Sequence, residues 1–72
     1  MPMRRFLLDR AVDNTGVSGV GVVAEGVEFS SGNVVMQWLG EHPSIVVWPD
    51  LRHALAVHGH DGATTVRWLD GV

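Results

Sequence analysis

A turn-forming stretch between two runs of alternating apolar residues indicates the fold class of this chain. The residues at positions 30–33, Ser-Ser-Gly-Asn, are small or turn-prone, and Gly32 can take the positive φ that a tight hairpin requires. Val34, Met36 and Trp38 then occupy alternate positions, which places their side chains on one face of a strand. This pattern predicts an antiparallel β-hairpin in the middle of the chain.

Further strands are predicted from the same signals on both sides of this hairpin. Extended runs bounded by turn-forming residues lie at 4–8, 20–30, 44–48 and 64–69. The run at 44–48 is apolar on both faces, which predicts a central place in the sheet. Gly26 inside the run at 20–30 indicates a bulge or a sharp bend, so this run is either one bent strand or two short ones.

One short helix is predicted before the last strand. Asp50 is a favoured N-cap, and the residues after it recur at helical spacing: Leu51, Ala54, Leu55 and His58. The order is β-β-β-β-α-β, and short loops favour antiparallel neighbours. We expect an α+β, mostly β fold in which a bent antiparallel sheet of about five strands has one short helix closing its open face. The alternative is a small SH3-like barrel, although that fold requires less helix.

The size and charge of the chain limit its functions. Its 72 residues suffice for a single small domain (1–72), and the absence of cysteine excludes disulfides and thiolate zinc ligands. A net charge of −3 with no lysine makes nucleic acid an unlikely partner, although Arg4, Arg5 and Arg10 could form a local basic spot. A core this small also favours a homo-oligomer, which would cover a bare edge strand.

Neither a membrane span nor catalysis is indicated. No apolar run reaches the length of a membrane span or of a signal peptide, so we expect a cytoplasmic protein without membrane contact. No serine lies in a nucleophile elbow. Glu25 and Glu28 could form a carboxylate pair, but we interpret them as the solvent face of a strand. We therefore expect no enzyme activity.

Histidines at the end of the predicted helix are the candidate metal ligands. His58, His60 and Asp61 place two imidazoles and a carboxylate within four residues, and His53 could add a fourth ligand. No second cluster stands at a recognisable spacing. The simpler interpretation is that His58 lies at the helix C-terminus, where a cation is favoured, and that the other two form a turn. A small metal-binding protein is the alternative function, and otherwise no cofactor is expected.

Three tryptophans suggest a core and an interaction site. Trp38 and Trp68 lie in alternating runs and are interpreted as core. Trp48 ends its strand beside a proline, and with Arg52 and Arg67 it has the composition of a protein-binding anchor. We predict a non-enzymatic protein-interaction module that engages a host protein or self-assembles, with Trp48, Arg52 and Arg67 as partner-binding residues.

Two stretches of the sequence resemble small uncharacterised proteins of actinobacteria and their phages. They are GVVAEGVEFSSGNVVMQWLGEHPS at 21–44 and HGHDGATTVRWLD at 58–70, and the resemblance runs from about residue 6 to residue 70. No established activity belongs to that group, so the resemblance transfers no site residue. It implies an actinobacterial or actinophage origin and a setting in the cytoplasm, that of the host if the chain is phage-encoded. A phage or prophage accessory protein fits this context.

Overall fold

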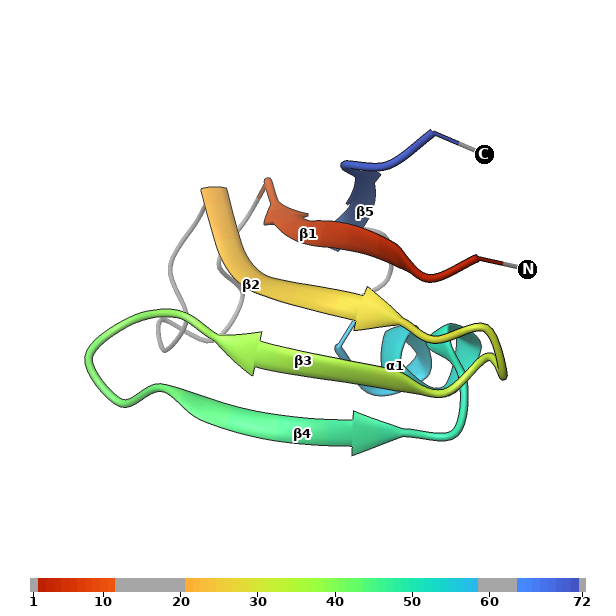
Figure 1. Cartoon of the computed structure of the whole chain (residues 1–72). Helices are drawn as coiled ribbons and strands as arrows, with labels where there is room; N and C mark the ends of the chain where they lie inside the picture. Colours follow the sequence, from red (N-terminus) through yellow and green to blue (C-terminus); the bar gives the residue numbers. More distant parts are fainter. Residues whose placement is uncertain (1, 12–20, 59–63, 72) are drawn as a thin grey trace.

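A computed structural model describes residues 2–11, 21–58 and 64–71, which form an open antiparallel sheet with one helix behind it (Figure 1). The elements, in chain order, are β1 (Arg4–Arg10), β2 (Gly21–Glu28), β3 (Val34–Trp38), β4 (Ser44–Trp48), α1 (Leu51–His58) and β5 (Thr64–Trp68). The sheet order is β4-β3-β2-β1-β5, and all neighbouring strands are antiparallel. The predicted α+β fold is confirmed, and the sheet does not close into the alternative barrel.

The central hairpin forms at the predicted turn. Glu28 pairs with Val34 at the ends of β2 and β3. The Phe29 N–H donates to the Asn33 carbonyl at 2.8 Å, and the Gly32 N–H donates to the Phe29 carbonyl at 2.9 Å. Gly32 has a φ of 96°, a region that favours glycine because a Cβ would clash with the backbone. The glycine therefore sets the turn that brings β2 and β3 together.

β2 is one bent strand, and its β-bulge lies three residues before Gly26, the glycine that predicted a bulge or a sharp bend. Leu8 pairs with Ala24, whereas Asp9 pairs with Val22, so that Val23 is the extra residue of a β-bulge. The bulge breaks the alternation of faces, and the consecutive residues Val23 and Ala24 are both buried. The sequence showed apolar residues here but no sign of which one would bulge.

Gly26 marks a close approach of a side chain to the strand. It pairs with Phe6 across β1 and β2, and the Phe6 ring lies over it. A Cβ at position 26 would clash with the Cζ atom of Phe6 and would lie 2.9 Å from its Cε1 and Cε2 atoms, inside van der Waals contact. Glycine at this position therefore makes room for a ring that is fully buried.

The core lies between α1 and the inner face of the sheet, the face on which α1 packs. Its buried side chains are Phe6, Leu8, Val23, Ala24, Val34, Met36 and Ala54. Trp38, Trp48 and Trp68 are partly buried and pack against this cluster, which confirms the prediction for Trp38 and Trp68. The Trp68 ring meets the Phe6 ring edge-on, with centroids 5.4 Å apart. These contacts join the three tryptophans to one small core.

α1 begins at the predicted cap. Asp50 Oδ1 accepts the backbone N–H of His53 at 2.8 Å, which satisfies one of the first donors of the helix. Ala54 is buried against the sheet, while Leu51 and Leu55 are partly buried beside it. No helix of the described ranges has the length and apolar character that crossing a membrane requires.

β4 lies at an edge of the sheet, where the sequence predicted a central strand. In the described chain its sheet neighbour is β3 alone. Val46 packs against the core, but Ile45 and Val47 point to the opposite side and are 66% and 69% exposed. The prediction was wrong because it assumed that an apolar face is a covered face. α1 covers only the inner face, so the outward residues of β4 stay in contact with water.

Candidate protein-binding surface

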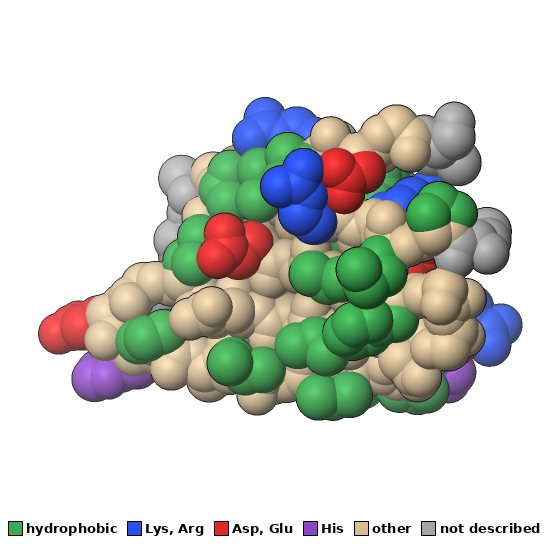
Figure 2. Space-filling model, viewed as in Figure 1, with side chains coloured by type: hydrophobic (Ala, Val, Ile, Leu, Met, Phe, Trp, Pro, Cys, Tyr) green, Lys and Arg blue, Asp and Glu red, His purple; other side chains and the backbone are tan. Residues whose placement is uncertain are grey.

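The outer face of the sheet, turned away from α1, carries aliphatic side chains on three neighbouring strands (Figure 2). Cross-strand pairing aligns Val27, Val35 and Val47 in one row, and it places Ile45 opposite Gln37 in the next row. We name the four aliphatic residues of these rows the outer patch: Val27, Val35, Ile45 and Val47. The two residues on β4 are exposed, and the other two are half-buried. Contiguous exposed apolar side chains of this kind are typical of protein contacts.

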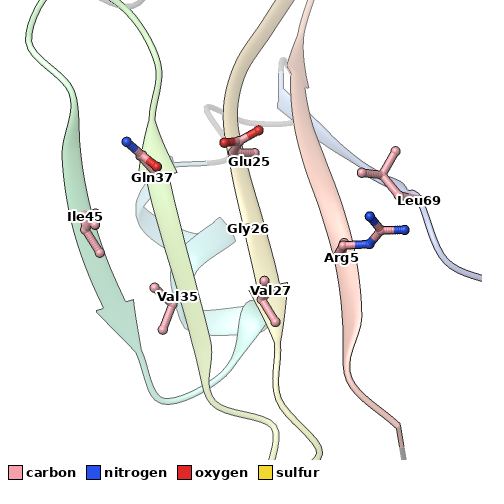
Figure 3. A pocket seen from close by; sticks show the side chains of 8 residues that line it. All are labelled: Arg5, Glu25, Gly26, Val27, Val35, Gln37, Ile45 and Leu69. Carbon is pink, nitrogen blue, oxygen red and sulfur yellow. The ribbon is translucent and has the colours of Figure 1, made fainter.

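A hollow of about 400 Å³ opens on the same face, and three residues of the outer patch line it (Figure 3). It is lined by Arg5, Glu25, Gly26, Val27, Val35, Gln37, Ile45 and Leu69. The side chains of Glu25 and Gln37 are exposed and make no hydrogen bond within the described ranges. An apolar centre beside polar groups that are open to a partner is the usual composition of a protein interface.

An ion pair holds one side of the hollow. The Arg5 Nη2 atom lies 2.8 Å from Asp70 Oδ1, and the Arg5 backbone N–H donates to Asp70 Oδ2 at 2.7 Å. Hydrogen bonds from the Arg5 side chain and backbone lower the pKa of Asp70 to about 2. The same side-chain hydrogen bond raises the pKa of Arg5. Both groups are therefore charged at neutral pH.

The other two arginines of the N-terminal segment are engaged in the fold. Arg4 Nη2 lies 2.8 Å from Glu28 Oε1, and the Arg4 guanidinium carbon lies 3.7 Å from the centre of the Trp68 ring. Arg10 is buried, and its Nε–H donates to Thr64 Oγ1 at 2.9 Å. The predicted basic spot is therefore not an exposed cluster.

Glu25 and Glu28 lie on opposite faces of β2. Residues three apart in a strand point in opposite directions. Glu25 is exposed on the outer face, whereas Glu28 is partly buried on the inner face against Arg4. They form neither a carboxylate pair nor a common solvent face, so the interpretation from sequence was wrong for Glu28.

The structure does not bring the three predicted partner-binding residues together. Trp48 is partly buried on the inner face of β4, and Arg52 is exposed in the first turn of α1. Arg67 is exposed on β5, at the other edge of the sheet, where its Nη1 atom lies 3.7 Å from Asp9 Oδ2. Their role in binding stays a prediction.

The residues that sequence reasoning missed are the outward residues of β4. Ile45 and Val47 alternate with the inward-facing residues of β4, but residues 45–48 are all apolar, so the sequence does not distinguish the outward face from the inward one. One helix of eight residues can cover only one face of a five-stranded sheet.

The candidate metal ligands fall mostly outside the described residues. The side chain of His58 and the whole of His60 and Asp61 lie outside them. His53 Nδ1 lies 2.7 Å from Asp50 Oδ1, and hydrogen bonds from the His53 backbone and side chain lower the pKa of Asp50. Within 2–11, 21–58 and 64–71, no three histidine, cysteine or acidic side chains gather at a common point. The metal-binding alternative stays a prediction.

Comparison with known proteins matches residues 3–70 to a family whose description is "Acb5 phage protein". The match covers nearly the whole chain and supports the phage part of the resemblance noted from the sequence. The actinobacterial source stays a prediction. No curated protein and no solved structure matches the chain.

Proposed function

Because the chain belongs to the Acb5 phage protein family, we propose that it is a phage accessory protein that acts by binding another protein, without catalysis. The binding surface in this proposal is the outer patch together with the free edge of β4. The observation that carries it is the exposure of Ile45 and Val47, at 66% and 69%, on a strand whose inward residues pack against the core.

The exposed area of these two side chains gives a partner a substantial source of affinity. Full burial of an aliphatic side chain of this size contributes about 1.5–3 kcal/mol, and roughly two thirds of that remains available here. Covering Ile45 and Val47 would therefore contribute about 2–4 kcal/mol together. That is equivalent to roughly 30-fold to 1,000-fold in affinity, before the cost of association.

The charge distribution favours a protein over a nucleic acid as the partner. The net charge is −3, and Arg4, Arg5 and Arg10 hold hydrogen bonds or ion pairs within the fold. A nucleic acid interface would need a basic surface that displaces the counterions of the phosphates. An uncharged aliphatic surface with polar groups beside it suits a protein surface instead.

A capture experiment with matched variants tests this proposal. Tagged wild-type protein, Ile45→Lys/Val47→Lys and Val57→Lys are incubated with a nuclease-treated lysate of the bacterial host, and retained proteins are identified by mass spectrometry. Val57 is a matched control because it is an aliphatic residue, 59% exposed, on α1. Untagged copies of this chain are added to the lysate, and we expect one protein near stoichiometry, either a host protein or the untagged copy, that is lost with the β4 variant and kept with the control. Equal retention by all three proteins would remove this surface from consideration.

A further inference from the structure

We propose that the partner of the β4 edge is a second copy of this chain, joined by antiparallel pairing of β4 with β4 about a two-fold axis through Val46. This inference rests on the proposed function, because it names the occupant of the same surface. The product is a continuous ten-stranded sheet with five strands from each copy.

The two edges of the sheet differ in the way that this pairing requires. β4 contains Ser44, three aliphatic residues and Trp48, without a charge or a bulge. β5, the opposite edge, contains two threonines and Arg67, whose guanidinium lies near Asp9. Natural sheets protect exposed edges with charges, prolines or bulges, because a bare edge pairs with other chains. β4 and β5 are the two edges of the described sheet (Figure 1). β5 carries a charged side chain, whereas β4 carries none between its flanking prolines.

Two prolines determine the register of the pairing. Pro43 and Pro49 flank β4 at equal distances from Val46, which is the middle residue of the five. Proline cannot donate to a ladder, so a register that uses every residue of β4 and neither proline is centred on Val46. A shift by one residue between the copies would set inward side chains against outward ones. The self-pairing is therefore limited to five residues and to one register.

In this register the exposed apolar residues cover each other. Ile45 of each copy lies beside Val47 of the other on the outer face, because both are one residue from the axis. Each pair extends the row of valines on its own sheet, so the outer patches of the two copies become continuous. The exposed large apolar side chains of β4 thereby cover each other across the axis.

The charges that flank β4 are complementary across the same axis. The loop that enters β4 carries Glu41 and His42, and the segment that leaves it carries Asp50 and Arg52. Antiparallel pairing about Val46 places the entry of one copy beside the exit of the other. Glu41 of one copy and Arg52 of the other then flank the same end of the paired strands. Glu41, His42 and Arg52 are exposed and make no ion pair within the described residues, so they are available to the second copy.

The mass of the protein in solution, measured by sedimentation equilibrium from about 1 µM to about 1 mM, tests the proposal. We expect a concentration-dependent dimer for the wild type, since a five-residue edge is a small interface. Ile45→Lys/Val47→Lys sets like charges opposite each other, and we expect its dissociation constant to rise at least about tenfold. Ile45→Lys/Val47→Glu sets opposite charges opposite each other, and we expect it to retain more dimer than the first variant. Val57→Lys should behave as the wild type.

A cysteine on the axis tests the register without disturbing the charge. The chain has no cysteine, so a single Val46→Cys substitution can form a disulfide only between two copies. Antiparallel partners have Cα atoms about 4.5–5.5 Å apart, within the range of a disulfide. We expect mild oxidation to give a covalent dimer with Val46→Cys and only monomer with Val57→Cys.

Three results would overturn the inference. They are a wild type that stays monomeric to about 1 mM, equal loss of dimer in both charged double variants, and equal cross-linking of the two cysteine variants. If the wild type is monomeric but captures a host protein that Ile45→Lys/Val47→Lys does not capture, the second copy is overturned as the partner and the proposed function stands. If the wild type forms no dimer and captures no protein, both the inference and the proposed function are overturned. Circular dichroism of each variant establishes that it is folded.

Discussion

Gly26→Ala tests the interpretation that the Phe6 ring takes the place of a side chain on β2. An alanine in a strand normally stabilises by about 0.4–1 kcal/mol relative to glycine, because it reduces the freedom of the unfolded chain. Here the added Cβ would lie 2.9 Å from two ring atoms of Phe6, about 0.6–1.1 Å inside the optimal contact distance. The ring is fully buried and packs edge-on against Trp68, so it has little room to move.

The clash therefore decides the sign of the effect. Overpacking a core by one carbon costs about 1–3 kcal/mol, which exceeds the gain from restricting the unfolded chain. We expect a net loss of about 1–2 kcal/mol in the free energy of unfolding. For a domain of this size, that corresponds to a fall in Tm of roughly 5–15 °C.

Urea denaturation and thermal melting of five proteins measure this effect. They are the wild type, Gly26→Ala, Phe6→Leu, the double variant, and Gly71→Ala as a control, because a Cβ at position 71 meets no atom within 4 Å. Leucine at position 6 removes the ring, so Gly26→Ala should cost less in that background than in the wild type. A Gly26→Ala protein as stable as the wild type, or the same cost in both backgrounds, would refute the reasoning.

Three further predictions concern single side chains. Asp70→Asn should lower Tm at pH 7, and the difference from the wild type should shrink as the pH falls from the ordinary carboxyl pKa of 3.8 through about 2. The sign follows because folding lowers the pKa of Asp70. The charged carboxylate therefore stabilises the fold at pH values above the unfolded pKa, and this stabilisation is lost when the carboxylate is protonated. A difference in Tm that is independent of pH would contradict this prediction. Asp50→Ala should lower Tm by removing the helix cap, whereas Asp50→Asn should largely preserve it; equal losses would show that the charge, not the cap, matters. Thr64→Val should cost about 1–3 kcal/mol in urea denaturation, because it removes the acceptor of the buried Arg10 Nε–H, while Thr64→Ser should retain most of the stability. A neutral Thr64→Val would show that another group satisfies this donor.

Most of the fold could be predicted because its signals are local. The hairpin depends on Gly32, and the start of the helix depends on Asp50, which acts within three residues of itself. The bulge at Val23 could not be predicted, because its position is set by pairing with Leu8 and Asp9 on another strand. The same holds for Gly26, whose neighbour Phe6 is twenty residues away in the sequence.

The candidate site was harder to predict for a related reason. Exposure depends on how many elements cover a face, and no single strand carries that information. Ile45 and Val47 have the composition of a buried strand, and only the edge position of β4 makes them a surface. Arg67 and Trp48 were grouped by residue type, but the sheet places them at opposite edges and on opposite faces.

Hydrogen exchange of the backbone amides at low and high protein concentration tests most directly whether the β4 edge pairs with a second copy of the chain. A partner on this edge would add hydrogen bonds to the free side of β4 and slow its exchange. The account predicts that protection of residues 44–48 rises with concentration, while that of β5 stays unchanged. Equal protection of β4 at both concentrations, or a rise at β5 instead, would contradict it.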